Sequence, residues 1–176
     1  MKNLINGFLI GVTMLGLAAF AAAQGKEIKV KIFDAQGKSV GVAEIEEAKN
    51  GSGVTIELDL KGLTPGMHGI HFHQVAKCEA PGFTSAGGHF NPMGKMHGMQ
   101  NPQGPHAGDI TNFEVNANGK AKVELKDERV SLGTGENSLF THGGTALVVH
   151  EKADDYTTDP SGNSGARIAC GVIISK

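Results

Sequence analysis

Apolar and polar residues alternate along most of the chain with a period of two residues. This period is typical of β-strands that bury one face, because successive side chains of a strand point to opposite sides. The clearest case is residues 54–60, in which four aliphatic residues alternate with Thr, Glu and Asp. Turns rich in glycine, proline and asparagine separate such segments. Strands are therefore predicted over residues 28–32, 39–46, 54–60, 67–73, 109–115, 120–126, 145–150 and 168–174.

Alternation is absent from two longer segments, residues 74–108 and 151–165, which are rich in glycine and polar residues. Long irregular stretches inside compact domains are uncommon and are usually functional. The sequence shows no repeat and no second domain. Eight short strands, two long loops and 26 glycines together predict an all-β domain, an eight-stranded Greek-key β-barrel or sandwich with two long functional loops.

The only long apolar run lies at the start of the chain. Lys2 precedes an uncharged stretch, residues 4–23, which ends with Ala21 and Ala23 in a small-x-small pattern. These features are typical of a secretory signal peptide. An uncleaved anchor is the alternative, since about 20 apolar residues span a bilayer, but the glycines and alanines of the stretch favour cleavage. We therefore expect a signal peptide at residues 1–23, a mature domain at residues 24–176, and export to a periplasm or the extracellular space without stable membrane association.

The amino-acid composition excludes some classes of protein and favours one kind of site. An apolar fraction of 39% is too high for a disordered chain. A formal net charge of −2, without a basic cluster, argues against a nucleic-acid partner. Histidine is the most informative residue, because six of the eight histidines lie between residues 68 and 106. Imidazole is the commonest metal ligand among side chains, so this concentration predicts a metal site.

A first ligand group is predicted around His71 and His73. They are two residues apart in a predicted strand, so both imidazoles project from one face. His150, at the end of another apolar strand, adds a third nitrogen, one fewer than the four that copper(II) favours. His89 is the candidate for the fourth, because a deprotonated imidazole binds one metal through each ring nitrogen. His68 lies at an odd spacing from His71 and is interpreted as a histidine bonded to nearby backbone.

A second group lies within the first long loop, where His89, His97, His106 and Asp109 follow the spacing H-x7-H-x8-H-x2-D. Three imidazoles and one carboxylate form a closed four-ligand set that suits structural zinc. A loop of this composition buries too little apolar surface to order itself, so a bound ion would supply the missing free energy. A solvated histidine-rich loop is the alternative.

Six motifs, in this order along the chain, resemble those of the copper/zinc superoxide dismutase family, and the match covers nearly all of the mature chain. They are Gly69-Ile70-His71-Phe72-His73, Ser85-Ala86-Gly87-Gly88-His89-Phe90-Asn91-Pro92, His97-Gly98, Gly104-Pro105-His106-Ala107-Gly108-Asp109, Leu147-Val148-Val149-His150-Glu151-Lys152-Ala153-Asp154-Asp155, and Gly162-Asn163-Ser164-Gly165-Ala166-Arg167-Ile168-Ala169-Cys170-Gly171.

The resemblance implies a superoxide dismutase, which converts superoxide to dioxygen and hydrogen peroxide through a copper that alternates between two oxidation states. It implies one copper and one zinc per subunit, with superoxide as the small-molecule partner. Family members are often homodimers, so a homodimer stays open for this chain. The implied copper ligands are His71, His73, His89 and His150, and the implied zinc ligands are His89, His97, His106 and Asp109.

The resemblance also implies roles for residues outside the two ligand sets. Arg167 would guide the anionic substrate, for which an ordinary surface arginine is the alternative. Asp154 would join a copper histidine to a zinc histidine, fixing both rings. Cys78 and Cys170 would form a disulfide, as an even cysteine count in an exported protein favours. His142 matches no ligand position.

Two other functions are alternatives. A non-enzymatic copper- or zinc-binding protein could have the same fold, but the presence of all four copper histidines favours the enzyme. A zinc-only hydrolase is disfavoured, because the zinc set is full and leaves no position for water. Met93, Met96 and Met99 recur every third residue around His97. Their thioethers suit copper(I) and could assist copper loading, although methionine more often serves in packing.

Overall fold

The computed structural model describes residues 26–48 and 52–175, so the predicted signal peptide lies outside the described residues. Within those residues no helix has the length and apolar character needed to cross a membrane. The regular elements are β1 (Glu27–Asp34), β2 (Ser39–Glu47), β3 (Val54–Lys61), β4 (Gly66–His68), β5 (Ile70–His73), η1 (Thr84–Ala86), β6 (Phe113–Val115), β7 (Lys120–Asp127), η2 (Thr141–Gly143), β8 (Thr145–His150) and β9 (Arg167–Ile173).

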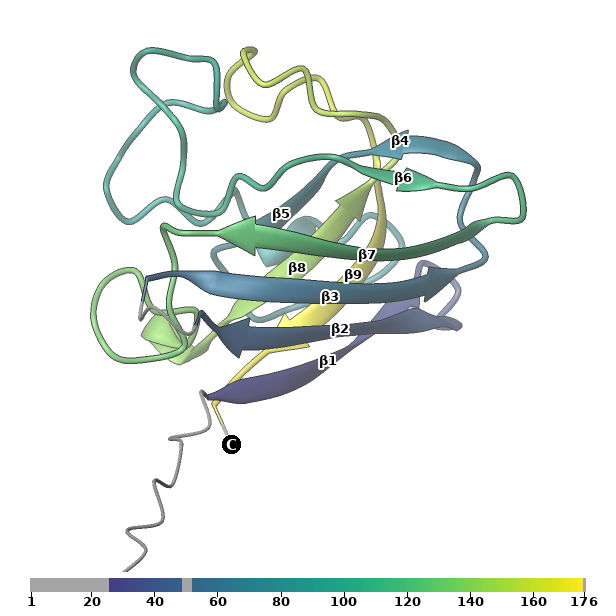
Figure 1. The fold of residues 1–176 in the computed structure, drawn as a ribbon, viewed down its shortest axis with the longest axis horizontal. Helices are drawn as coiled ribbons and strands as arrows, with labels where there is room; N and C mark the ends of the chain where they lie inside the picture. The colour runs from purple at the N-terminus through teal and green to yellow at the C-terminus, as the bar shows by residue number, and fades with distance from the viewer. Residues whose placement is uncertain (1–25, 49–51, 176) are drawn as a thin grey trace, which may run out of the picture.

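Seven strands form one antiparallel sheet in the order β5-β8-β9-β1-β2-β3-β7, and β4 pairs with β6. In Figure 1 the sheet curls on itself, with β1, β2, β3 and β7 in front and β5, β8 and β9 behind. Neighbours such as β3 and β7 are not consecutive in the sequence, so the chain crosses between the two halves as in a Greek key. The prediction of an all-β barrel with two long loops is confirmed.

The alternation seen in the sequence produces the core. In β3 the aliphatic residues are buried and most of the polar ones between them are exposed. Ile56 of β3 lies opposite Ile45 of β2 and Leu125 of β7, so the apolar faces of three strands coincide. Each large aliphatic side chain that is fully buried stabilises the fold by about 1.5–3 kcal/mol relative to exposure.

The strand predicted over residues 67–73 is two strands in the structure, divided at Gly69. The N–H of Gly69 donates to the Lys152 carbonyl at 2.8 Å, and the N–H of His150 donates to the Gly69 carbonyl at 2.9 Å. As a result β4 pairs with β6, whereas β5 pairs with β8. The strand predicted over residues 109–115 is likewise shorter, because Asp109 makes a single bridge with His71 instead of continuing β6.

β8 is buried on both faces, since one face lines the barrel and the other lies under the first long loop. A disulfide between Cys78 of that loop and Cys170 of β9 links the loop to the sheet. The predicted disulfide is therefore confirmed. The small apolar cluster beneath the loop consists of Phe83, Ala86, Ala146, Val148 and Cys170.

Candidate metal centre

β5 is an edge strand of the sheet, and the first long loop covers its free edge. Phe72 points into the core, so its neighbours His71 and His73 point to the opposite face. The N–H of Phe72 donates to the Gly108 carbonyl at 2.9 Å, and the N–H of Phe90 donates to the Phe72 carbonyl at 2.7 Å. These contacts satisfy the edge of β5 and bury both histidines completely.

The loop segments that dock on β5 carry two further ligand candidates. His89 forms a single bridge with His73, and Asp109 forms one with His71. A Cβ at Gly108 would lie 2.4 Å from a backbone carbonyl oxygen of β5, so the close approach requires glycine here. The backbone therefore brings residues from the loop to the histidines of the strand.

Four imidazoles converge at this place, those of His71, His73, His89 and His150, which we call the copper group. All are buried, and one ring nitrogen of each lies within 4.8 Å of the others. The Nε2 atoms of His73 and His150 are 3.4 Å apart. Among the described residues, His71 Nδ1 and His89 Nε2 have no hydrogen-bond partner although they are buried. Such atoms are costly unless a ligand satisfies them, and four nitrogens suit copper(II), so the group fits that ion.

The outward-facing nitrogens of three of these rings are fixed by hydrogen bonds. His71 Nε2 donates to the Asp154 carboxylate at 2.7 Å, and His73 Nδ1 donates to a loop carbonyl at 3.0 Å. Ser164 Oγ donates to a carbonyl, so His150 Nδ1 is the donor in its 3.0 Å contact with Ser164 Oγ. Each bond selects the tautomer whose facing nitrogen is unprotonated, which is the form that binds a metal.

The second set, His89, His97, His106 and Asp109, is called the zinc group. Asp109 Oδ1 lies 2.9, 3.0 and 3.3 Å from the Nδ1 atoms of His89, His97 and His106 respectively. Its other oxygen, Oδ2, accepts from the backbone N–H groups of Gly98 and His106. Four ligand atoms around tetrahedral zinc, with bonds of about 2.0–2.1 Å, lie about 3.3 Å apart. The observed spacing therefore fits zinc.

Two side chains connect the copper group and the zinc group. His89 belongs to both, with Nδ1 facing Asp109 and Nε2 among the copper-group nitrogens. Asp154 contacts His71 Nε2 through one oxygen at 2.7 Å and His97 Nε2 through the other at 3.0 Å. The two sets are therefore parts of one centre.

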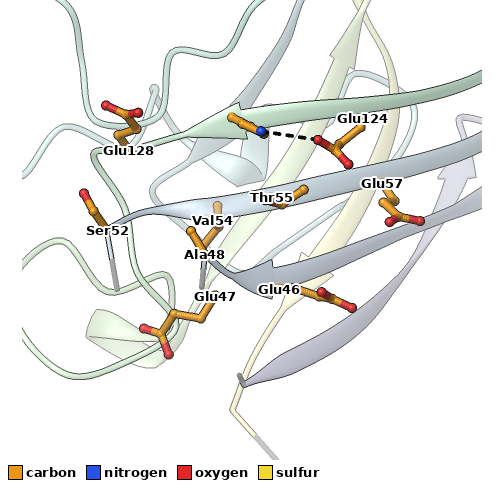
Figure 2. Close-up of a pocket in the computed structure, with 10 residues that line it drawn as sticks. Glu46, Glu47, Ala48, Ser52, Val54, Thr55, Glu57, Glu124 and Glu128 are labelled. Atoms are coloured by element: carbon orange, nitrogen blue, oxygen red, sulfur yellow. Dashed lines mark ion pairs between the residues drawn. The ribbon is translucent and has the colours of Figure 1, made fainter. Parts of the chain in front are cut away.

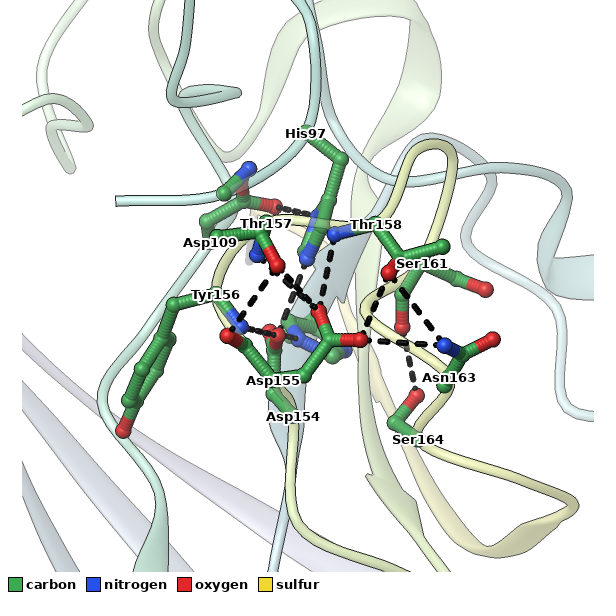
Figure 3. A network of polar contacts seen from close by, with 12 residues as sticks. His97, Asp109, Asp154, Asp155, Tyr156, Thr157, Thr158, Ser161, Asn163 and Ser164 are labelled. Carbon is green, nitrogen blue, oxygen red and sulfur yellow. Dashed lines mark hydrogen bonds and ion pairs between the residues drawn. The ribbon is translucent and has the colours of Figure 1, made fainter. Parts of the chain in front are cut away.

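Asp154 is held in place by its own loop and by Asn112. Within the loop, shown in Figure 3, the N–H of Tyr156 donates to Asp154 Oδ1 at 2.6 Å. Asn112 exchanges two hydrogen bonds of 2.8 Å with the backbone of Asp154. Asp155 accepts hydrogen bonds from other groups of the second long loop, and these bonds fix the shape of that loop. A Cβ at Gly162 would lie 1.9 Å from Asp154 Oδ1 and 2.7 Å from His97 Nε2. Glycine at this position thus permits the contact between carboxylate and imidazole.

Burial controls the protonation of the copper group. It lowers the pKa of His73 well below its usual range, that of His89 to about 4 and that of His150 to about 2. Burial also lowers the pKa of His71, although the hydrogen bond to Asp154 opposes it. These rings are neutral at pH 7, which is the state in which imidazole binds metals.

His97 behaves in the opposite way. Burial alone would lower its pKa, but hydrogen bonds to Asp109 and Asp154 raise the pKa to about 9. Burial also opposes ionisation of both carboxyls, yet the hydrogen bonds from the histidines outweigh it and hold both pKa values below the usual range. Two carboxylates around one imidazole favour a positive charge there, either a proton or a metal ion.

A pocket of about 530 Å³ opens over the centre and is lined by His89, His106, His150 and Arg167, among others. The Arg167 guanidinium donates to two carbonyls of the first long loop, at 2.8 and 2.7 Å. Among the described residues that line this pocket, only Arg167 carries a permanent charge and none is acidic. The pocket therefore presents one cation to an approaching anion.

A groove on the outer face of β2, β3 and β7 has the opposite character. Figure 2 shows this groove, in which glutamates predominate. Among the described residues that line it, Lys126 is the one basic residue, and it is 3.5 Å from Glu124. The groove disfavours anions, whereas the pocket over the histidines presents a cation to them. The glutamates that line the groove are Glu46, Glu47, Glu57, Glu124 and Glu128.

Comparison with known proteins agrees with this geometry. The family model for copper/zinc superoxide dismutase (SODC) matches residues 39–173. The chain belongs to the copper/zinc superoxide dismutase family. Superoxide dismutase (Cu-Zn) 2 of Aquifex aeolicus is 46% identical over 175 residues, which cover 98% of this chain and 99% of that protein. Superoxide dismutase-like protein YojM of Bacillus subtilis is 44% identical over 82% of this chain and 74% of its own.

Solved structures of similar proteins have the same fold. The crystal structure of a superoxide dismutase-like protein from Bacillus subtilis has a TM-score of 0.80 at 43% identity, covering 83% of this chain and 97% of that one. The Cu/Zn superoxide dismutase from Brucella abortus has a TM-score of 0.68 at 33% identity. The match covers 84% of this chain and 99% of that one. The resemblance to this family that the motifs indicated is therefore confirmed.

Other predictions about this superoxide dismutase family member concern residues outside the two groups. The ring nitrogens of His68 lie against two backbone carbonyls, that of His150 at 2.7 Å and that of Thr64 at 2.8 Å, so its interpretation as a backbone-bonded histidine is confirmed. His142 is exposed in η2 and belongs to neither group. Met93 and Met96 are exposed on the first long loop, and their part in copper loading stays a prediction.

Sequence reasoning missed the residues that support the ligands. Asn112 and Ser164 contact Asp154 and His150 across 42 and 14 residues of sequence, and no spacing rule links such pairs. Gly162 and Ser164 do lie within one of the quoted motifs, which was the available signal. Their contacts depend on how the second loop folds over the barrel.

Proposed function

We propose that this protein is a superoxide dismutase that uses one copper and one zinc. The observation that carries the proposal is the position of His89, whose two nitrogens face two buried donor sets of different chemistry. Family membership supports the same activity. The reaction combines two superoxide anions and two protons to give one dioxygen and one hydrogen peroxide.

The proposed copper ligands are His71 through Nδ1 and His73, His89 and His150 through Nε2. The proposed zinc ligands are the Nδ1 atoms of His89, His97 and His106 and the Oδ1 of Asp109. When bound, copper supplies a one-electron redox couple, whereas zinc has no redox chemistry and holds the loop.

The side chains of this protein bind the substrate and hold the ligands in position. Arg167 attracts the superoxide anion into the pocket and offers its guanidinium to it. Asp154 accepts the Nε2 protons of His71 and His97, which fixes both tautomers. The buried Nε2 of His89 is placed to hold a proton after the first superoxide has reacted and to release it to the peroxide product.

We further propose that residues 1–23 are removed and that residues 24–176 act outside the cytoplasm. The disulfide between Cys78 and Cys170 supports this location, because disulfides persist in oxidising compartments. Superoxide itself would be the partner of the mature domain.

The test is metal analysis combined with a superoxide-consumption assay, before and after selective removal of copper. We expect the copper-replete protein to consume superoxide, the copper-depleted protein to lose this activity, and added copper to restore it. A His150→Gln variant should lose copper, whereas His142→Gln, a change outside both groups, should keep it. Bound copper and zinc with superoxide decaying at its spontaneous rate would instead identify a non-enzymatic metal-binding protein.

A further inference from the structure

Arg129 connects the zinc group to the end of β7. Its Nη2 donates to the backbone carbonyl of Asp109 and also lies 2.9 Å from Asp127 Oδ1. The backbone N–H of Arg129 donates to the same Asp127 oxygen at 3.0 Å. Asp127 is the last residue of β7 and is 1% exposed, so it is anchored in the barrel. One guanidinium therefore joins a strand of the barrel to a ligand residue of the loop.

Arg129 contacts the backbone of Asp109, whereas the zinc group surrounds its side chain. The Oδ1 of Asp109 faces three histidines, and its Oδ2 accepts from the N–H groups of Gly98 and His106. All of those partners belong to the same long loop and could shift together with Asp109. The backbone next to this ligand is already docked on β5, through the bridge of Asp109 with His71. Arg129 lies outside the loop, so its hydrogen bond ties the Asp109 backbone to a second strand of the barrel, at the end of β7.

Stability alone explains this pair poorly. Asp127 Oδ2 and Arg129 Nε are buried and have no hydrogen-bond partner among the described residues. Burial raises the pKa of Asp127 to about 7, even though Arg129 attracts its negative charge. The Asp127 side chain is buried, whereas that of Arg129 is 32% exposed. An ion pair that is partly exposed and only partly hydrogen-bonded adds little to folding stability, and buried polar atoms without partners call for another explanation. The contact of Arg129 with Asp109, a proposed zinc ligand, provides that explanation.

We propose that Arg129 is a positioning residue for zinc, which fixes Asp109 against β7 so that its Oδ1 stays within the four-donor set. This inference rests on the proposed function, in which the zinc group holds zinc. Neither the sequence motifs nor the ligand spacing indicates this role for Arg129 and Asp127. A residue that orients a ligand typically changes metal affinity about 10–100-fold when it is replaced.

The test compares zinc affinity, measured by chelator competition on the full mature protein, between the unmodified chain and Arg129→Met. We expect the variant to bind zinc about 10–100-fold more weakly. Cobalt(II) substituted for zinc should show altered visible absorption bands, which report the ligand geometry. The matched control is Lys126→Met, which removes an exposed cation from the adjacent end of β7 and should change neither readout.

A second variant keeps the result interpretable if Arg129→Met folds poorly. Arg129→Lys keeps the charge but replaces the planar guanidinium with one ammonium group, so zinc affinity should fall to an intermediate value. Unchanged zinc affinity in both Arg129 variants, with or without lower thermal stability, would overturn the inference, as would an equal loss in Lys126→Met. If the unmodified chain bound no zinc at these donors, the proposed function itself would fail.

Discussion

Histidines of the same burial have different roles in this protein, and the difference lies in the partners of each ring nitrogen. His68 uses both nitrogens on backbone carbonyls, so neither is left for a ligand. His71 uses one nitrogen on Asp154 and leaves the other buried without a partner. What a ring nitrogen faces, a backbone carbonyl or the ligand atoms of other side chains, therefore separates a structural histidine from a ligand candidate better than burial or proximity in sequence does.

Arg167 is the residue on which attraction of the substrate is expected to depend. Arg167→Glu replaces the only permanent charge among the described residues that line the pocket with the opposite charge. We expect superoxide consumption to fall about tenfold or more and to lose its sensitivity to salt. The measurement is the rate over a series of ionic strengths, with copper and zinc content determined on the same samples.

Lys122→Glu is the matched control, because it makes the same change of charge on the exposed outer face of β7. The control should keep most of the activity. An unchanged rate in Arg167→Glu at full metal content would show that Arg167 does not guide the substrate.

Zinc uptake should depend on pH through His97. Hydrogen bonds to two carboxylates overcome the effect of burial and raise the pKa of His97 to about 9. Below that pH the ring is protonated on both nitrogens, so zinc must displace the proton on Nδ1 in order to bind. Apparent zinc affinity should therefore rise about tenfold per pH unit toward pH 9 from this group alone and level off above it. Calorimetric zinc titrations of the metal-depleted protein in several buffers would count the protons released.

Asp154→Asn provides a check on that interpretation. Removing this carboxylate lowers the pKa of His97, so the dependence on pH should move to lower pH. Zinc binding that releases no proton below pH 9 would contradict the assignment of His97 as a ligand.

At the scale of elements, the two long loops lie side by side at one end of the barrel (Figure 1). The N–H of Gln100 donates to the Tyr156 carbonyl at 3.0 Å, and the N–H of His97 donates to Asp159 at 2.6 Å. Neither loop has a large apolar core of its own, and the polar contacts between them converge on ligand residues. The geometry of each loop therefore depends on the other.

Gly162→Ala tests this dependence between the loops. The added Cβ would lie 1.9 Å from Asp154 Oδ1 and would separate that oxygen from His97. We expect zinc affinity to fall about tenfold or more, since a partner that orients a ligand is displaced. Chelator competition measures the loss.

Gly94→Ala is an unusually close control. Gly94 has a φ of +61° against +62° for Gly162, and a Cβ at Gly94 would meet nothing within 4 Å. Both substitutions share the backbone strain, about 1–2 kcal/mol, and only one has the steric conflict. Equal zinc affinities in the two variants would mean that the approach of Asp154 to His97 does not matter.

At the scale of the whole molecule, the barrel and the metal centre depend on different forces. The main core is built from barrel strands whose apolar faces meet, whereas the centre is held by hydrogen bonds to histidines and carboxylates. The barrel is therefore expected to stay folded when metal is removed, while the loops lose part of their order.

Chelation of both metals should accordingly leave the far-ultraviolet circular dichroism of the β-strands largely unchanged. Amide hydrogen exchange should become faster in residues 88–109 and 151–166 and should change little in β2 and β3. Loss of strand signal on chelation would show instead that the barrel requires the metals to fold.

The sequence by itself determined the strands, the ligand residue types and the family, because each is encoded by local order. Alternation in residues 54–60 predicts a half-buried strand wherever it lies, and the spacing of His71 and His73 places both rings on one face. The break at Gly69 was missed, because it results from contacts with His150 and Lys152, which lie some eighty residues away.

Only the tertiary structure decided which ring nitrogens of His71 and His89 lack a hydrogen-bond partner, how Asp154 reaches two histidines, and that Arg129 contacts the backbone of Asp109. These contacts join residues far apart in sequence, so no local period encodes them. They follow from strand register, from loops that close over an edge strand, and from glycines that allow close approach. The donor atoms are a property of the sequence, whereas their convergence on one centre is a property of the folded barrel.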